Sequence, residues 1–209
     1  MPQTATLPDA PAWPDDMPAA FTEVPREPLL RLMVPHLRAG GDHPMVIFDD
    51  GVELSCADFL RATERLASGL ASRISPGDEV GLAIGNRAEF LIAYYAVQSL
   101  RAVVVQFGPK VGDVEAAHIA ADRGLTLAIA DGPAADVLER VLDGQITVLR
   151  VDPDAPEPHG LDAFGATPGR RLDDLAATPQ DIISIGYTSG TTGLPKALPF
   201  THDEPLRYA

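Results

Sequence analysis

The chain has little cysteine and no long apolar run. A single cysteine, Cys56, among 209 residues excludes an internal disulfide bond, and its surroundings give no sign of reactivity. The first residues do not place a basic segment before an apolar one, the pattern of a secretion signal. No apolar run approaches the roughly 20 residues that a bilayer span requires. These absences favour a reducing compartment, so we expect a cytoplasmic protein without a transmembrane segment.

Basic side chains are also scarce. Lys and Arg together number 16 against 30 Asp and Glu, which gives a formal net charge of −14. Proteins that bind nucleic acid do so through clustered Lys and Arg, so this balance argues against a nucleic-acid partner. Net charge is a property of the whole surface, however, and one locally positive nucleotide site remains compatible with it.

The remaining composition is that of a globular protein, with 45% hydrophobic and 22% charged residues. Residues 1–27 are rich in proline and are predicted to form an arm rather than a packed element. Residues 28–209 carry the folded part. Its first helix is expected to begin near Pro28 and to break at Pro35. A hairpin is predicted next, with strands at 45–48 and 52–54.

The central region alternates strand and helix signals. Ser55 and Asp58 resemble a capping box and open an amphipathic helix that ends near Ser75. Short β-rich runs then alternate with helical stretches, and the helix at 90–100 is apolar on nearly every side, which predicts burial. This alternation predicts an α/β fold whose mainly parallel sheet is flanked by helices. The strand runs are residues 80–84, 102–107, 125–130 and 146–151. The helical stretches are residues 88–100, 113–121 and 134–142. Residues 152–170 are predicted to be irregular, followed by a short helix at 172–176.

The most informative segment is a hydroxyl- and glycine-rich loop that ends in a lysine. It lies between two strand-like runs, 182–185 and 197–200. Its glycines permit positive φ, its amides and hydroxyls can donate to phosphate oxygens, and its lysine adds a positive charge. The segment reads Tyr187-Thr188-Ser189-Gly190-Thr191-Thr192-Gly193-Leu194-Pro195-Lys196. It is neither a Walker A loop nor a dinucleotide fingerprint. A polar surface turn is the alternative, but the whole pattern favours phosphate binding.

The histidines that precede the glycine-rich loop carry less information than the loop does. His36, His43 and His159 show no metal-ligand spacing, so we expect no metal site formed by the chain. His118 lies in an alanine-rich helical stretch, where a structural or surface role is the simpler interpretation.

The decapeptide at 187–196, with Thr201-His202 after the following strand, is similar to the signature of the adenylate-forming synthetases. That family includes acyl- and aryl-CoA ligases, luciferases and peptide-synthetase adenylation domains. Residues 76–105 also resemble the early β-α-β region of these enzymes. The resemblance implies that 28–209 is an incomplete N-terminal AMP-binding domain that ends just after the phosphate loop.

The resemblance also implies a two-step ligation. A carboxylic acid reacts with ATP and Mg²⁺ to give an acyl-adenylate and pyrophosphate, and a thiol, commonly coenzyme A, then displaces AMP. Lys196 and Thr191 would assist the chemistry. The residues implied to hold the nucleotide are Thr188, Ser189, Gly190, Thr191, Thr192, Gly193, Lys196 and His202.

The sequence departs from the family pattern in places. Arg101 stands where many members have glycine, and Gln106-Phe107-Gly108-Pro109 and Ala197 also differ from the usual residues. No residue matches the family's magnesium-binding acid, ribose-binding aspartate or late catalytic lysine, so a C-terminal half or second chain is expected as a partner. Three hypotheses stay open: part of a ligase, a self-standing nucleotide-binding module, and a truncated product with an exposed sheet edge.

Overall fold

The computed structural model describes residues 27–48, 53–108, 110–151, 171–172, 177–188 and 194–204. They form a six-stranded sheet of order β6-β5-β3-β4-β7-β8 and a separate two-stranded sheet, β1-β2. The elements are α1 (Leu29–Gly40), β1 (Pro44–Ile47), β2 (Glu53–Ser55), α2 (Cys56–Leu70), β3 (Glu79–Ala83), α3 (Ala88–Ser99), β4 (Val103–Gln106), α4 (Asp113–Arg123), β5 (Leu127–Asp131), α5 (Gly132–Leu142), β6 (Thr147–Val151), β7 (Ile182–Thr188) and β8 (Lys196–Thr201).

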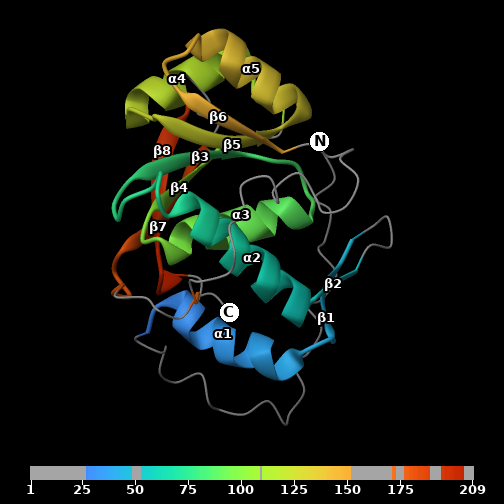
Figure 1. The fold of residues 1–209 in the computed structure, drawn as a ribbon. Helices are drawn as coiled ribbons and strands as arrows, with labels where there is room; N and C mark the ends of the chain where they lie inside the picture. The colour runs from blue at the N-terminus through green and yellow to red at the C-terminus, as the bar shows by residue number, and fades with distance from the viewer. Residues whose placement is uncertain are drawn as a thin grey trace, which may run out of the picture.

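The large sheet is parallel except at one edge. Strands β3 to β7 pair in parallel, and β8 returns antiparallel to β7. Within the described residues β8 is therefore the edge strand, and its outer side pairs with no other strand. Figure 1 shows β7 and β8 running at a steep angle to β5 and β6, which is the accumulated twist of the sheet.

Helices cover both faces of the sheet. Helices α1, α2 and α3 lie on one side and α4 and α5 on the other (Figure 1). Side chains of β5 point alternately to the two faces of the sheet. Leu127 and Ile129 belong to the core beneath α2 and α3. Ala128 and Ala130 belong to the core beneath α4 and α5. Burial on both faces explains why these strands read as continuous apolar runs.

The architecture agrees with the sequence predictions. The α/β class with a mainly parallel sheet is confirmed, as is the early hairpin. Helix α2 begins as predicted, with the Ser55 hydroxyl accepting a hydrogen bond of 3.1 Å from the Asp58 amide. No residue of α3 is exposed, which confirms its predicted burial.

The predicted break at Pro35 is wrong. Helix α1 continues through this proline to Gly40. Proline removes one backbone hydrogen bond, but Leu30, Val34 and Leu37 lie on one side of α1 and are all buried. Their burial on both sides of the proline outweighs the lost bond.

Several predictions fall outside the described residues. They concern the arm over residues 1–26, the hairpin turn, the irregular connection at 152–170, most of the short helix at 172–176, and the last residues of the chain.

Candidate functional site

The predicted phosphate loop joins β7 to β8 and follows the carboxyl end of a parallel strand. Thr188, the last residue of β7, lies opposite Lys196, the first residue of β8, and both are exposed. The intervening predicted residues, Ser189, Gly190, Thr191, Thr192 and Gly193, lie outside the described residues.

The two faces of β7 meet different helices. Ser184 accepts a hydrogen bond of 3.1 Å from the Tyr94 hydroxyl of α3, whereas Ile185 belongs to the core under α4 and α5. Alternation then places Thr188 on the α3 side and Tyr187 on the α4 side. Residues directly opposite each other in a sheet point to the same face, so Lys196 shares the face of Thr188.

Helix α4 contacts the other face of the hairpin. The Tyr187 hydroxyl donates to Asp122 Oδ2 at 2.5 Å. His118 Nε2 lies 3.1 Å from the Pro195 carbonyl oxygen and must donate the hydrogen, because a carbonyl only accepts. The His118 and Tyr187 rings meet edge to face, with centroids 6.4 Å apart. The structural role predicted for His118 fits this contact, but nothing in the sequence pointed to Pro195 as its partner.

The bond between Tyr187 and Asp122 has a fixed direction. Burial raises the pKa of the Tyr187 hydroxyl, and the hydrogen bond to Asp122 with its negative charge raises that pKa further. Tyr187 therefore keeps its proton near neutral pH and acts as the donor.

His202, at the end of β8, lies at the other end of the hairpin. Thr201 pairs with Ile182 at the start of β7, whereas Thr188 pairs with Lys196. Six residues of extended strand separate the Thr201–Ile182 pair from the Thr188–Lys196 pair, which corresponds to roughly 20 Å. The structure thus brings Thr188 and Lys196 together and does not bring His202 to them.

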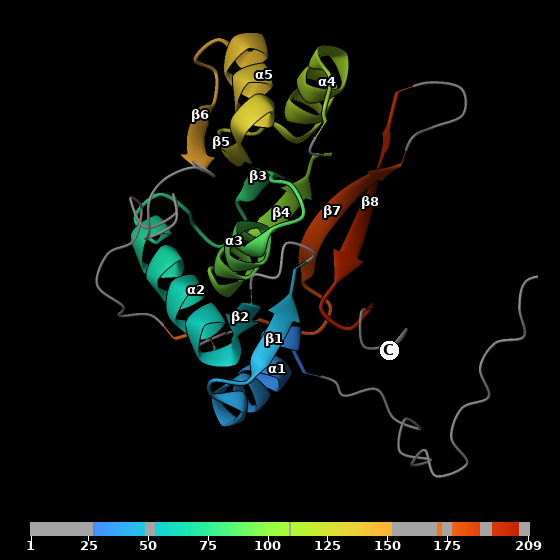
Figure 2. The same ribbon diagram turned by 90° about the vertical axis from the view of Figure 1, so that its right-hand side faces the viewer.

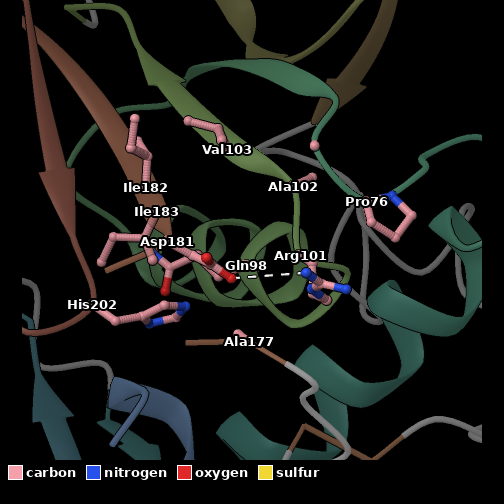
Figure 3. Close-up of a pocket in the computed structure, with 11 residues that line it drawn as sticks. Pro76, Gln98, Arg101, Ala102, Val103, Ala177, Asp181, Ile182, Ile183 and His202 are labelled. Atoms are coloured by element: carbon pink, nitrogen blue, oxygen red, sulfur yellow. Dashed lines mark ion pairs between the residues drawn. The ribbon is translucent and has the colours of Figure 1, made fainter. Parts of the chain in front are cut away.

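His202 instead borders a cavity of about 310 Å³ at the amino ends of β3, β4 and β7 (Figure 3). The Gln98 carboxamide and His202 Nδ1 are buried there and make no hydrogen bond of normal geometry to the described residues. Burial raises the pKa of the Tyr94 hydroxyl, and Gln98 lies close enough to that group to oppose the rise. Burial lowers the pKa of His202, and the nearby carboxylates of Asp181 and Asp203 oppose that shift. The lining residues are Pro76, Gly77, Gln98, Arg101, Ala102, Val103, Ala177, Asp181, Ile182, Ile183 and His202.

Arg101 stands out in this cavity. Its φ of 59° lies in the left-handed region that glycine adopts freely, which fits the expectation from the family resemblance that glycine stands at this position. Its guanidinium lies 3.8 Å from the Asp181 carboxylate, and both side chains are about two-fifths exposed. The sequence singled out Arg101 as a departure but gave no signal for Gln98.

The described residues at the two ends of the hairpin form no metal centre. The part of the chain that the structure describes has no group of three or more His, Cys, Asp or Glu side chains able to hold a metal ion. Its helices also include none that is both long and apolar enough to cross a bilayer.

The topology favours the carboxyl edge as the ligand-binding edge. After β3 the chain enters α3 on one face, and after the neighbouring β4 it enters α4 on the other. In open α/β sheets, ligands bind outside the carboxyl ends of the strands where the connections change face. The loop after β7 begins one strand away from this point.

Comparison with known proteins agrees with these features. The family model described as AMP-binding enzyme matches residues 36–209. Feruloyl-CoA synthase of an Amycolatopsis species is 32% identical over 162 residues, which cover 77% of this chain and 30% of that enzyme. Long-chain-fatty-acid–CoA ligase FadD13 of Mycobacterium tuberculosis is 31% identical over 156 residues, which cover 71% of this chain and 27% of that enzyme.

A solved structure shows the same fold. The inhibitor-bound N-terminal domain of FACL13 from Mycobacterium tuberculosis aligns with a TM-score of 0.68 at 24% identity, covering 84% of this chain and 44% of that one. The chain spans less than a third of the length of the curated relatives named above. Since the family model covers most of the sequence, from residue 36 to residue 209, the chain belongs to the AMP-binding enzyme family.

Proposed function

We propose that this chain is the N-terminal part of an ATP-dependent acid–CoA ligase. In the first step a carboxylate oxygen attacks the α-phosphorus of ATP, the bond from that phosphorus to the bridging oxygen breaks, and pyrophosphate leaves. In the second step the sulfur of coenzyme A attacks the acyl carbon and AMP leaves. The names of the relatives and the family support this reaction class.

The observation that carries the proposal is the pairing of Thr188 with Lys196 at the mouth of the signature loop. Both are exposed on one face of the hairpin, so a lysine ammonium and a hydroxyl can meet one polyphosphate. Lys196 and Thr191 would stabilise the charge that collects on the phosphates during the first step. Ser189 and Thr192 would donate further hydrogen bonds, and Gly190 and Gly193 would allow the backbone to approach the ligand. His202 lies too far from Lys196 for the proposal to include it.

Magnesium would enter with the nucleotide. The described residues contain no acidic cluster that could hold it, and Mg²⁺ is commonly bound through substrate phosphates with one or two carboxylates. We assign those carboxylates, and the residues that contact ribose and coenzyme A, to a C-terminal half or a second chain. The acid substrate is proposed only as a carboxylic acid, because the relatives named above act on different ones. Cytoplasmic residence remains a prediction.

Calorimetric titration with Mg–ATP tests the binding step. The chain contains two lysines, Lys110 and Lys196, and both are exposed. We expect saturable binding that weakens roughly 10- to 100-fold in Lys196→Ala, as for loss of one charged hydrogen bond. The control Lys110→Ala should bind like the wild type. Equal binding by Lys196→Ala, or no binding by the wild type, would refute the proposed site.

Acid-dependent exchange between ATP and pyrophosphate tests the chemistry. A chimera in which this chain replaces the matching segment of the feruloyl-CoA synthase should exchange pyrophosphate only when a carboxylic acid is added, and Lys196→Ala should reduce the rate. ATP binding without exchange in a folded chimera would favour the alternative, a nucleotide-binding module without turnover.

A further inference from the structure

We infer that helix α4 positions Lys196 through His118, Asp122 and Tyr187, which hold the backbone on both sides of this lysine. The inference deepens the proposed function and rests on it for the meaning of Lys196. It assigns these three side chains as positioning residues, since they act on Lys196 through the backbone and not on the ligand.

The hairpin needs such support because its tip extends past the rest of the sheet. Strand β4 pairs with β7 only at Val104–Ser184 and Val105–Ile185. The last residues of β7 and the first of β8 pair only with each other, and the tip rises to the level of α4 (Figure 2). A two-stranded ribbon by itself is at best marginally stable in water.

Helix α4 makes a hydrogen bond to β7 and another to the residue that directly precedes β8. Asp122 accepts from the Tyr187 hydroxyl on β7 at 2.5 Å, and His118 bonds to the carbonyl of Pro195 at 3.1 Å. Pro195 directly precedes Lys196. Tyr187 pairs with Ala197, which directly follows it. The two contacts therefore fix the peptide before Lys196 and the strand position after it.

Helix α4 is itself firmly held, so it can serve as a fixed support. Its Ala116 and Ile119 side chains are fully buried in the core beneath the sheet face. Near its end, Arg123 Nε donates to Glu79 Oε2 of β3 at 2.7 Å. Gly124 then ends the helix with a φ of 59°, a left-handed conformation that glycine adopts without strain.

Holding the backbone in this way matters because lysine is a flexible ligand. Ordering a long lysine side chain costs conformational entropy, and a mobile backbone would add to that cost. With α4 on the Tyr187 face, alternation directs Lys196 to the opposite face beside Thr188. The support therefore lies behind the lysine and leaves its ammonium group free of α4.

The two lysines make a direct test possible without any ligand. Selective labelling with [¹⁵N]lysine gives one backbone amide signal from Lys196 and one from Lys110, an internal control. Tyr187→Phe and His118→Phe should lower the heteronuclear NOE of Lys196 and leave Lys110 unchanged. His118→Gln keeps a hydrogen-bond donor at this position, so the heteronuclear NOE of Lys196 in this variant should be close to that of the wild type. An unchanged Lys196 signal in both Phe variants would overturn the inference.

Titration with Mg–ATP provides the second readout. Each Phe variant should weaken binding by roughly 2- to 10-fold, the equivalent of one net hydrogen bond. Asp113→Asn is the matched control, because this α4 carboxylate pairs with Arg140 at 2.6 Å and not with the hairpin. If Lys196→Ala loses binding while both Phe variants bind like the wild type, the inference fails and the proposed function stands. If the wild type does not bind, the proposed function fails and the lysine signals alone decide the inference.

Discussion

The two ends of the β7–β8 hairpin are built in opposite ways. At the tip, Thr188 and Lys196 are exposed, and side chains of α4 supply hydrogen bonds to the strands that carry them. At the base, Ile183 and His202 are both 2% exposed, and the polar atoms nearby include the Gln98 carboxamide, which makes no hydrogen bond of normal geometry to the described residues.

This difference separates binding from stability along one hairpin. Exposed residues at the tip bury little surface, so their substitution costs little folding free energy and can be used for ligand contacts. Buried residues at the base contribute to the core but lie roughly 20 Å from Lys196. We therefore expect changes at the base to alter stability without altering nucleotide affinity, and changes at the tip to do the reverse.

The largest effect should come from Ile183→Ala at the base. Removing this buried side chain should lower the free energy of unfolding by about 2–4 kcal/mol, measured by urea denaturation. Leu198→Ala, on the 47% exposed Leu198 of β8, should cost less than about 0.5 kcal/mol. The folded fraction of Ile183→Ala should still bind Mg–ATP with the affinity of the wild type. A large affinity loss in this variant would contradict the separation of the two ends.

Gln98→Leu should raise stability by about 1 kcal/mol, because a buried carboxamide that makes no well-formed hydrogen bond to the described residues is replaced by an apolar group of similar size. Urea denaturation measures the change. Gln98→Glu provides the opposite case, since it places a charge at the same buried position and should destabilise the fold. If Gln98→Leu proves destabilising, the amide has a partner that the described residues do not show.

A smaller gain is expected from Arg101→Gly. Glycine removes the cost of holding a side-chain-bearing residue at φ 59°, about 1–2 kcal/mol, but it also loses the exposed ion pair with Asp181 and adds freedom to the unfolded chain. Arg101→Ala loses the same ion pair and keeps the backbone strain. The glycine variant should therefore have the higher melting temperature of the two. Equal melting temperatures would show that the relief of backbone strain does not exceed the added entropy of the unfolded glycine chain.

The smallest effect should be a pH dependence from His202. Burial lowers its pKa in the folded protein, so below the unfolded value of about 6.5 the unfolded chain binds the extra proton first. Stability should accordingly fall as the pH drops from above about 6.5 towards the lowered folded pKa. The free energy of unfolding, measured with urea at about pH 7.5 and about pH 5.5, should decrease more between these pH values for the wild type than for His202→Gln. The same loss in both proteins would mean that the fold does not lower the pKa of His202.

The sequence predicted the elements better than their contacts. Apolar periodicity was sufficient for the α/β class and for the burial of α3, because burial follows directly from local composition. The rule that proline breaks a helix failed at Pro35, where the burial of apolar residues on both sides outweighs the local helix breaker. The site shows the same limit. The motif identified Lys196 and Thr188, which are close in sequence, but the link from Asp122 to Tyr187 joins residues 65 positions apart. The resemblance also grouped His202 with the loop, and only the strand register shows that it lies at the other end of β8.

Among the described residues β8 is the edge strand of the sheet, which has a consequence for association between copies of this chain. Its exposed Leu198 and Phe200 lie on the sheet face that Lys196 shares, and apolar residues on an edge strand favour the addition of a foreign strand. Pro199 lies between them and has no backbone N–H, so any ladder that forms along β8 lacks one donor. Proline at this position acts as a gatekeeper against aggregation, and Pro199→Val should make the chain more prone to form fibrils.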